Sequence, residues 1–215
     1  KSALASYAKS QLFKDCSQTN VKTPFTRTFS DFPHFIDDWE NWVIKPDAPI
    51  YGKKNVYLPS TTYEAVKAFQ AALFESANNL VNIQSYIKGT NLSAMAFCHK
   101  NRCQRIICFD EWVEVNHENG INGLGVTFPS IITSKKTNLK ISCAIDKLLK
   151  YWVSDNGIIF FTFRVDHRGI PWLYEVNLGL SGDAVAEKLL PAVFGITFDQ
   201  LCKIDIKLNC GEFSD

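Results

Sequence analysis

Apolar residues recur at helical spacing at the start of the chain. In Ser2–Asp15, Leu4, Ala8 and Leu12 repeat every four positions, which places them on one face of a helix. Ser60 and Glu64 are placed to cap the start of another helix. The sequence predicts helices over Ser2–Asp15, Ser30–Asp38, Ser60–Ala77, Asn138–Trp152 and Gly182–Phe194.

Short runs of strand-forming residues lie between these helices, and turn-forming residues bound them. The Gly- and Asn-rich stretch Asn116–Gly125 is predicted to be a loop. Strands gathered on either side of helices, without strict alternation, favour an α+β fold with a cleft over a clustered sheet. The predicted extended segments are Val21–Arg27, Trp42–Lys45, Tyr51–Leu58, Val81–Tyr86, Ser93–His99, Cys103–Val115, Gly157–Asp166 and Trp172–Asn177.

Composition and charge narrow the function classes. A chain of 215 residues has room for one large domain or two small lobes with a sizeable core. Its net charge of +1 and the lack of a Lys/Arg cluster argue against nucleic-acid binding. No apolar run approaches the length of a membrane span, so we expect no membrane partner.

The cysteines and histidines do not form a metal-binding pattern. The seven cysteines are an odd number and include no C-x-x-C pair, which favours reduced thiols and a cytoplasmic location. Four histidines are scattered without metal-ligand spacing. The cysteines are Cys16, Cys98, Cys103, Cys108, Cys143, Cys202 and Cys210.

Glu175 and Asn177 are the first candidate functional residues. They end the second strand of a predicted hairpin, just before a Gly-rich segment, and residues two apart on a strand share a face. A carboxylate and an amide oxygen on one face can hold Mg²⁺ against substrate phosphates. The alternative is a hairpin whose Glu and Asn only meet solvent.

Several basic residues are candidates for phosphate contacts. Lys45 ends a strand, and Lys53 and Lys54 follow Gly52 in a turn whose amides and ammonium groups can lie over phosphates. Arg164, on the first strand of the hairpin, is a candidate for stabilising a phosphoryl group in transfer. The alternatives are solvated surface lysines and, for Arg164, a surface ion pair with Asp166 or a neighbour.

A candidate nucleoside site lies in the middle of the chain. Gln84, Ser85, Tyr86 and Ile87 close a strand, and such a strand end presents backbone groups that suit the edge of adenine, with Tyr86 or Ile87 as an apolar wall. Asn91, two residues beyond Gly89, can reach a ribose hydroxyl.

The order of these segments resembles the ATP-grasp ligases over nearly the whole chain. The segments are WVIKPD, GKKNVYL, a helix, IQSYIKGTNLSAMAF, GINGLGVTFPS and FTFRVDHRGIPWLYEVN, and no one of them is specific alone. Within the superfamily the chain is most similar to the glycinamide ribonucleotide synthetase branch. In GINGLGVTFPS, the residues Phe128, Pro129 and Ser130 match the end of that branch's Gly-rich loop.

The resemblance implies a fold and a chemistry. It implies two lobes that hold ATP between two mainly antiparallel sheets, with Mg²⁺, or Mn²⁺ in its place, on Glu175 and Asn177. By the same resemblance Lys45 contacts the α-phosphate and adenine N7 region, Lys53 or Lys54 lies in a flexible phosphate loop, and Gln84–Ile87 forms the adenine hinge. Family members phosphorylate a substrate carboxylate, and an amine or similar nucleophile then attacks the acyl phosphate.

Three positions depart from the family pattern. Thr162 stands where many members have another acidic metal ligand, although the glycinamide branch also tends to lack that acid. Gly179 replaces an arginine that commonly contacts phosphates, and Asn91 replaces the usual ribose-binding acid. Arg164 is the candidate replacement for the missing positive charge.

The resemblance also sets the expected domain organisation. We expect one ATP-grasp domain over residues 1–215, with a smaller nucleotide-clamping lobe at 35–87 and a larger metal-binding lobe at 88–215, on which residues 1–34 pack. The family's usual N-terminal α/β domain is not in this chain, which opens on Lys1, so we expect a fragment of a longer protein or a minimal form whose substrate is a large partner.

Three functions remain open from sequence. The first is an ATP-dependent ligase that joins a small-molecule or peptide carboxylate to an amine. The second is a catalytically weak or inactive nucleotide-binding module with a regulatory or interaction role. The third is an α+β domain that binds no nucleotide.

Overall fold

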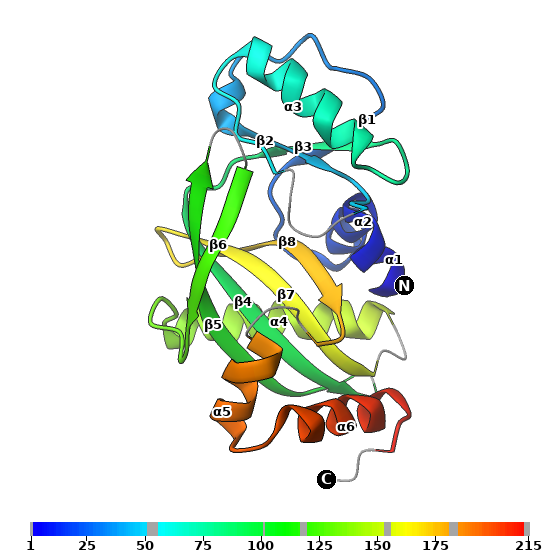
Figure 1. Cartoon of the computed structure of the whole chain (residues 1–215), viewed down its shortest axis with the longest axis vertical. Helices are drawn as coiled ribbons and strands as arrows, with labels where there is room; N and C mark the ends of the chain where they lie inside the picture. The colour runs from blue at the N-terminus through cyan, green and yellow to red at the C-terminus, as the bar shows by residue number, and fades with distance from the viewer. Residues whose placement is uncertain are drawn as a thin grey trace.

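The computed structural model describes residues 2–50, 56–100, 102–116, 120–152, 156–180 and 185–212. Helices and 3-10 or π turns cover both sheets (Figure 1). They are α1 (Ser2–Tyr7), α2 (Lys9–Thr19), η1 (Trp39–Asn41), α3 (Thr62–Phe74), α4 (Lys135–Trp152), η2 (Val185–Leu189), α5 (Leu190–Phe194) and α6 (Phe198–Asn209).

The strands form two antiparallel sheets. One has three strands in the order β1-β3-β2 and the other has five in the order β6-β5-β4-β7-β8. The α+β prediction is therefore confirmed. The strands are β1 (Thr26–Phe29), β2 (Trp42–Pro46), β3 (Val81–Ser85), β4 (Gly89–His99), β5 (Arg102–Asn116), β6 (Gly120–Thr127), β7 (Gly157–Asp166) and β8 (Pro171–Leu178).

The three-stranded sheet carries α3 on one face. Ile44, Val81 and Ile83 alternate toward this helix and pack against its Ala65 and Phe69. The intervening residues of the strands point to the opposite face. Because β1 pairs with β3, this sheet includes chain that precedes the expected lobe boundary at residue 35.

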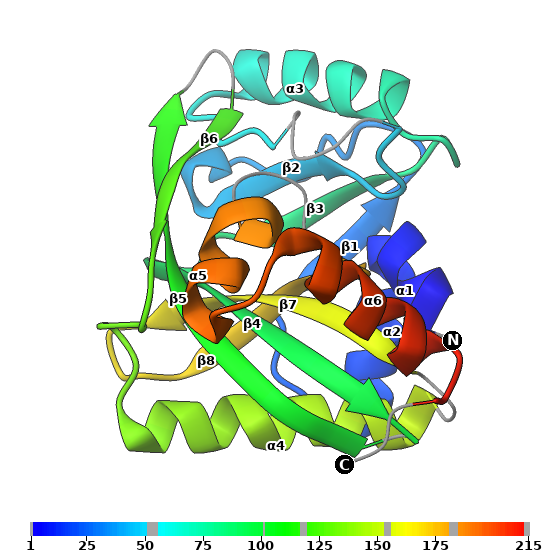
Figure 2. The same cartoon turned by 60° about the horizontal axis from the view of Figure 1, so that its bottom comes forward.

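The five-stranded sheet is covered on both faces, as Figure 2 shows. Helices α2 and α4 pack on one face, α2 through Leu12 and α4 through Ile141 and Ile145. On the other face, η2, α5 and α6 cover part of the sheet. Each layer buries apolar residues that alternate along the strands, and this burial is the main stabilising term for such a layered fold.

Three sequence-based predictions of secondary structure are wrong. Ser30–Asp38 is not helical, because Pro33 removes a donor and disfavours helical backbone at Phe32, whose ring packs in the small core instead. The predicted first helix is two, separated at Ala8, whose backbone is extended. The predicted loop Asn116–Gly125 contains most of strand β6, because pairing with β5 supplies backbone partners that outweigh its glycine content.

The prediction also missed a helix. It ended the last helix at Phe194, where Gly195 adopts a φ of 65°, but α6 follows directly. Thr197 and Gln200 form a capping box at the start of α6, and Leu201, Ile204 and Leu208 repeat at helical spacing after it.

Candidate functional site

One face of the five-stranded sheet changes character along its strands. Near one end it carries apolar side chains under α5 and α6, and near the other it carries polar ones. The apolar half is Met95, Phe97, Ile107, Phe109, Ile158 and Phe160. The polar half is Asn91, Ser93, Glu111, Thr162, Arg164, Glu175 and Asn177, placed on the same face by strand register.

Strand pairing brings the polar half together from four strands. Asn91 of β4 lies opposite both Glu111 of β5 and Arg164 of β7. In the neighbouring row, Thr162 lies between Ser93 and Glu175. Directly opposed side chains on one face lie within interaction range, so these residues form one surface. The hydrogen bond from Ser93 Oγ to Glu111 Oε1 is consistent with this arrangement.

The predicted metal pair lies at the edge of this surface. Glu175 is opposite Thr162, and Asn177 is opposite Phe160 on the adjoining apolar half, so the two side chains share a face. A carboxylate and an amide oxygen there fit a hard cation that keeps some water or phosphate ligands. Among the described residues, no group of three or more His, Cys, Asp or Glu side chains could hold a metal ion by itself.

Lys45 links the small sheet to this surface. Its Nζ donates to Gln84 Oε1 at 2.8 Å and lies 5.6 Å from the ring centre of Phe13 and 5.4 Å from that of Tyr174. Phe13 belongs to α2 and Tyr174 to β8, so Lys45 sits where both sheets and α2 meet. Burial, with the positive charge of Lys9, lowers the pKa of Lys45 to about 7, against the opposing charges of Glu175 and Asp47.

Lys9 is a site residue that the sequence analysis missed. Its Nζ lies 3.4 Å from Glu175 Oε1, and both side chains are largely buried. Lys9 lies in the predicted first helix, and a lysine in such a helix is normally predicted to face solvent. Only the fold places it against the predicted metal ligand. Lys9 and Lys45 therefore lie beside Glu175 between the sheets, with the buried carboxylate of Asp47 nearby, and two lysines so placed can meet an anionic ligand.

The Asp47 carboxylate connects α2 to the small sheet, close to Lys9 and Lys45. The buried carboxylate accepts hydrogen bonds from Ser10 N at 2.6 Å, Ser10 Oγ at 2.8 Å, and the amides of Asn78 and Asn82, each at 2.7 Å. Ser10 lies in the first turn of α2, and the two asparagines flank the first residue of β3. The network ties the helix that carries Lys9 to the sheet that carries Lys45.

Tyr174 is a second residue that sequence missed. Burial, with the negative charges of Glu111 and Glu175, raises the pKa of Tyr174, while Arg164 opposes this effect. The phenol therefore stays protonated and can donate a hydrogen bond at neutral pH. It lies at the irregularity between Thr162 and Phe163, where β8 has one more residue than β7.

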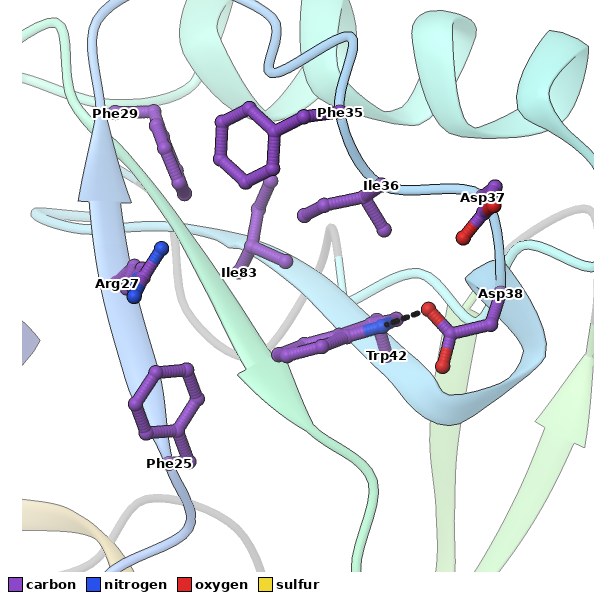
Figure 3. A pocket seen from close by; sticks show the side chains of 9 residues that line it. All are labelled: Phe25, Arg27, Phe29, Phe35, Ile36, Asp37, Asp38, Trp42 and Ile83. Atoms are coloured by element: carbon purple, nitrogen blue, oxygen red, sulfur yellow. Dashed lines mark hydrogen bonds between the residues drawn. The ribbon is translucent and has the colours of Figure 1, made fainter.

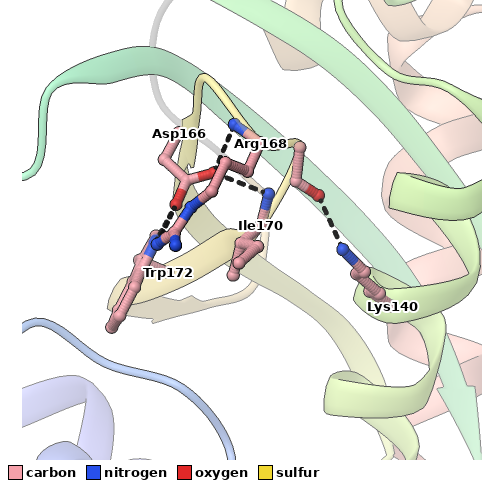
Figure 4. A network of polar contacts seen from close by, with 6 residues as sticks. Lys140, Asp166, Arg168, Ile170 and Trp172 are labelled. Atoms are coloured by element: carbon pink, nitrogen blue, oxygen red, sulfur yellow. Dashed lines mark hydrogen bonds and ion pairs between the residues drawn. The ribbon is translucent and has the colours of Figure 1, made fainter.

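Arg164 contacts the predicted adenine segment. Its Nη2 donates to Tyr86 Oη at 3.0 Å, and its guanidinium lies 4.9 Å from the Tyr86 ring centre. The alternative pairing with Asp166 does not occur, since Asp166 instead accepts from Arg168 N, Ile170 N and Trp172 Nε1 in the β7–β8 turn (Figure 4). These bonds fix the hairpin that carries Arg164 and Glu175.

Other predicted nucleoside contacts are partly occupied within the protein. Ser85 N donates to Phe25 O at 2.8 Å and Tyr86 N to Asn41 O at 2.7 Å, which leaves Ile87 N as the open donor of this stretch within the described residues. Asn91 Oδ1 and Arg164 Nε are buried without a hydrogen-bond partner there. Buried polar atoms normally have partners, so these two are available to a ligand. Lys53 and Lys54 lie outside the described residues.

A separate hollow of about 250 Å³ lies on the face of the small sheet that carries α3 (Figure 3). Phe25, Phe29, Phe35 and Trp42 line it together with Arg27. None of the predicted site residues that the structure describes lines it. In the described part of the chain, no helix has the length and apolar character needed to cross a membrane.

Comparison with known protein families shows to which family the chain belongs. The family described as phosphoribosylglycinamide synthetase, ATP-grasp (A) domain, matches residues 6–183. The chain belongs to this ATP-grasp family. The match covers α2, both sheets and all of the polar half. Comparison with curated proteins finds no match.

Solved structures support the same fold at low sequence identity. D-alanine–D-alanine ligase from Bacillus anthracis has a TM-score of 0.70 at 18% identity, covering 97% of this chain and 69% of that one. The same enzyme was also solved in complex with ATP, with a TM-score of 0.70 at 18% identity over 97% of this chain and 66% of that one.

Two further ATP-grasp structures match nearly the whole chain. Phosphoribosylglycinamide synthetase from Anaerococcus prevotii gives a TM-score of 0.63 at 14% identity over 97% of this chain and 52% of that one. L-amino acid ligase from Bacillus licheniformis gives 0.68 at 17% identity over 99% and 50%. The chain thus spans about half of these two proteins.

Proposed function

We propose that this chain is the nucleotide-binding and catalytic part of an ATP- and Mg²⁺-dependent ligase that joins a carboxylate to an amine through an acyl phosphate. The observation that carries the proposal is that Lys9 and Lys45 meet Glu175 of the polar half between the two sheets. The comparisons add that related folds belong to ligases, one of them solved with ATP.

The residues divide into contacts with different parts of ATP. Lys45 and Lys9 would neutralise phosphate charge, with Lys53 or Lys54 over the phosphates. The backbone at Ile87 would meet the adenine edge, within the hinge formed by Gln84, Ser85 and Tyr86. Asn91 Oδ1, buried and without a partner in the described structure, would accept a hydrogen bond from a ribose hydroxyl.

Glu175 and Asn177 would hold Mg²⁺, or Mn²⁺ in its place, and their oxygen donors fit such an ion. The bound ion supplies charge neutralisation between phosphates. Arg164 would stabilise negative charge on the transferring phosphoryl group from the neighbouring strand, and the two sheets would exclude water around the reacting carboxylate. The acid and the amine are proposed to be small molecules or peptides, with contacts supplied by a further domain or a partner protein.

A catalytically weak nucleotide-binding module remains the second candidate. Thr162 lies directly opposite Glu175, so the position beside the metal pair presents a hydroxyl instead of a second carboxylate. Gly179 follows the pair without the phosphate-binding arginine. Fewer anionic and cationic groups around the phosphates would weaken transition-state stabilisation more than ground-state binding.

Thermal unfolding with and without Mg-ATP tests the shared part of both candidates. At a ligand concentration one hundred times Kd, binding should add about 2.7 kcal/mol to the free energy of unfolding. We expect Glu175→Gln to abolish the Mg²⁺-dependent part of this shift. The matched control is Glu114→Gln, which changes an exposed carboxylate on β5 and should leave the shift intact. No shift with Mg-ATP would exclude both candidates.

Product formation separates the candidates. A ligase should release ADP and phosphate only when both an acid and an amine are present, and a panel of amino acids and short peptides provides the first substrates. If Mg-ATP binds while the full-length protein forms no ADP with any member of the panel, the binding module is the better description.

A further inference from the structure

Two cysteines face each other across the β4–β5 hairpin, far along the strands from the polar half. Cys98 and Cys103 are directly paired in the strand register, next to an irregularity between Phe97 and Cys98. Paired residues of antiparallel strands have Cα atoms about 4.5 to 5.5 Å apart. A disulfide requires about 4.4 to 6.8 Å, so the backbone already has the spacing of a disulfide.

Their side chains also lie on the same face of the sheet. Cys98 is part of the buried core between the sheet and α4, and Cys103 packs against that core. The Cys98 thiol donates to Ala96 O at 3.7 Å, and the Cys103 thiol donates to Arg105 O at 3.3 Å. Neither cysteine forms a disulfide in this structure, so the pair is present in its reduced form.

The two thiols differ in exposure, as expected for an attacking and a resolving cysteine. Cys103 is partly exposed, whereas Cys98 is fully buried. The interaction with the Cys98 side chain lowers the pKa of Cys103, and the Arg105 backbone adds to this, although burial and Asp146 act in the opposite direction. Burial raises the pKa of Cys16 to about 12 and, with Asp110 and Cys103, that of Cys108 to about 11. Cys103 is thus a reachable nucleophile, and Cys98 is placed to resolve the product.

We propose that Cys98 and Cys103 form a reversible disulfide through exchange with a low-molecular-weight disulfide such as glutathione disulfide. The Cys103 thiolate attacks one sulfur of glutathione disulfide and releases one glutathione thiolate, which leaves a mixed disulfide on Cys103. Cys98 then loses its proton to solvent and attacks the Cys103 sulfur, releasing the second glutathione. Two protein thiols are oxidised and one glutathione disulfide is reduced to two glutathione molecules. This site is independent of the proposed nucleotide function.

Peptide mapping of the oxidised protein tests the proposal. The full chain is equilibrated with glutathione disulfide, its remaining thiols are alkylated, and it is digested with trypsin without reductant. Cleavage after Lys100 and Arg102 separates the peptide 89–100, which holds Cys98, from the peptide 103–105, which holds Cys103. The two peptides stay joined only through the disulfide. We expect the joined peptide to be the main protein disulfide and to disappear with dithiothreitol.

Variants distinguish exchange from chance oxidation. Cys98→Ser should trap the mixed disulfide with glutathione on Cys103, because the resolving thiol is gone. Cys103→Ser should leave Cys98 unmodified, because it is buried. Cys143→Ser removes an exposed cysteine on α4 and should behave as the wild type. The proposal fails if exposed Cys143 becomes glutathionylated while the joined peptide is absent, or if Cys103 stays unmodified in Cys98→Ser. Melting curves of each variant confirm that the folded protein is being tested.

Discussion

The polar and apolar halves of one sheet face have the same strands but different tasks. β4 contributes Asn91 and Ser93 to the polar half and Met95 and Phe97 to the apolar half. The apolar half is sealed by α5 and α6, with Phe109 and Phe160 in edge contact at 6.0 Å between ring centres. The polar half lies toward the small sheet, where Lys45 approaches it.

The difference shows how a sheet can support a charged site. Burying apolar side chains at one end of each strand stabilises the whole strand, and this offsets the cost of grouping charges at the other end. The polar residues are held on strands instead of loops, which limits their movement relative to one another. Stability should therefore depend mainly on the apolar half, and ligand binding on the polar half.

The largest expected effect comes from breaking the apolar half. Phe160 is 5% exposed and lies opposite Asn177 of the predicted metal pair. Phe160→Ala should reduce the free energy of unfolding by about 3 to 5 kcal/mol, because it removes a large buried side chain and leaves a cavity. Urea unfolding at 25 °C measures the loss.

A matched substitution and a binding measurement complete this test. Phe74→Ala changes a phenylalanine that is 83% exposed at the end of α3 and should alter stability by less than about 0.5 kcal/mol. Below its unfolding transition, Phe160→Ala should keep most of its affinity for Mg-ATP. A similar loss of stability in both variants would contradict the division between the two halves.

The sequence predicted the fold from features that act locally or in fixed order. The β7–β8 hairpin, with Glu175 and Asn177 on one face, follows from alternation and a turn. Helix α6 carried a local signal too, the Thr197–Gln200 capping box, which the prediction overlooked. Strand β6 carried none, because its glycines give little strand preference and only β5 supplies its partners.

The site was predictable only where it lies within one element or follows the family order. Lys9 is separated from Glu175 by most of the chain, and no local pattern connects them. The same holds for Lys45 and Tyr174, which meet because the small sheet folds back over β8. Contacts between distant segments depend on the packing of whole layers, which periodicity does not describe.

The pH dependence of stability sharpens the comparison, because Lys45 is a buried ammonium at the polar half. Its pKa is about 7 in the folded protein, against about 10.4 for an exposed lysine. Between these values the unfolded chain holds a proton that the folded chain has lost. The free energy of unfolding should therefore rise with pH in this window by up to about 1.4 kcal/mol per pH unit. Below pH 7 both states hold the proton, so Lys45 adds no pH dependence there.

The comparison with Lys45→Met isolates this single group. Urea unfolding between pH 6 and 10 should give curves for the wild type and the variant that diverge above pH 7, with the wild type gaining stability. Parallel curves would show that Lys45 keeps its ordinary pKa. If phosphates bind beside Lys45, they should restore its proton, so nucleotide binding should take up a proton near pH 8, measurable by calorimetry in buffers of different ionisation enthalpy.

The smallest expected effect lies at the boundary between the polar half and the small sheet. Tyr86→Phe removes the hydroxyl that accepts a hydrogen bond from Arg164 but keeps the ring under the guanidinium. We expect a loss of about 1 kcal/mol in the free energy of unfolding, since a part-buried hydrogen bond to a charged group is lost. Tyr86→Leu removes the cation–π contact as well and should cost about 0.5 to 1 kcal/mol more.

Tyr63→Phe, at a tyrosine that is 69% exposed on α3, is the control and should be neutral. A loss for Tyr86→Phe as large as that for Phe160→Ala would mean that the polar half also carries the stability of the fold, because the Arg164 contact would then be holding the two sheets together.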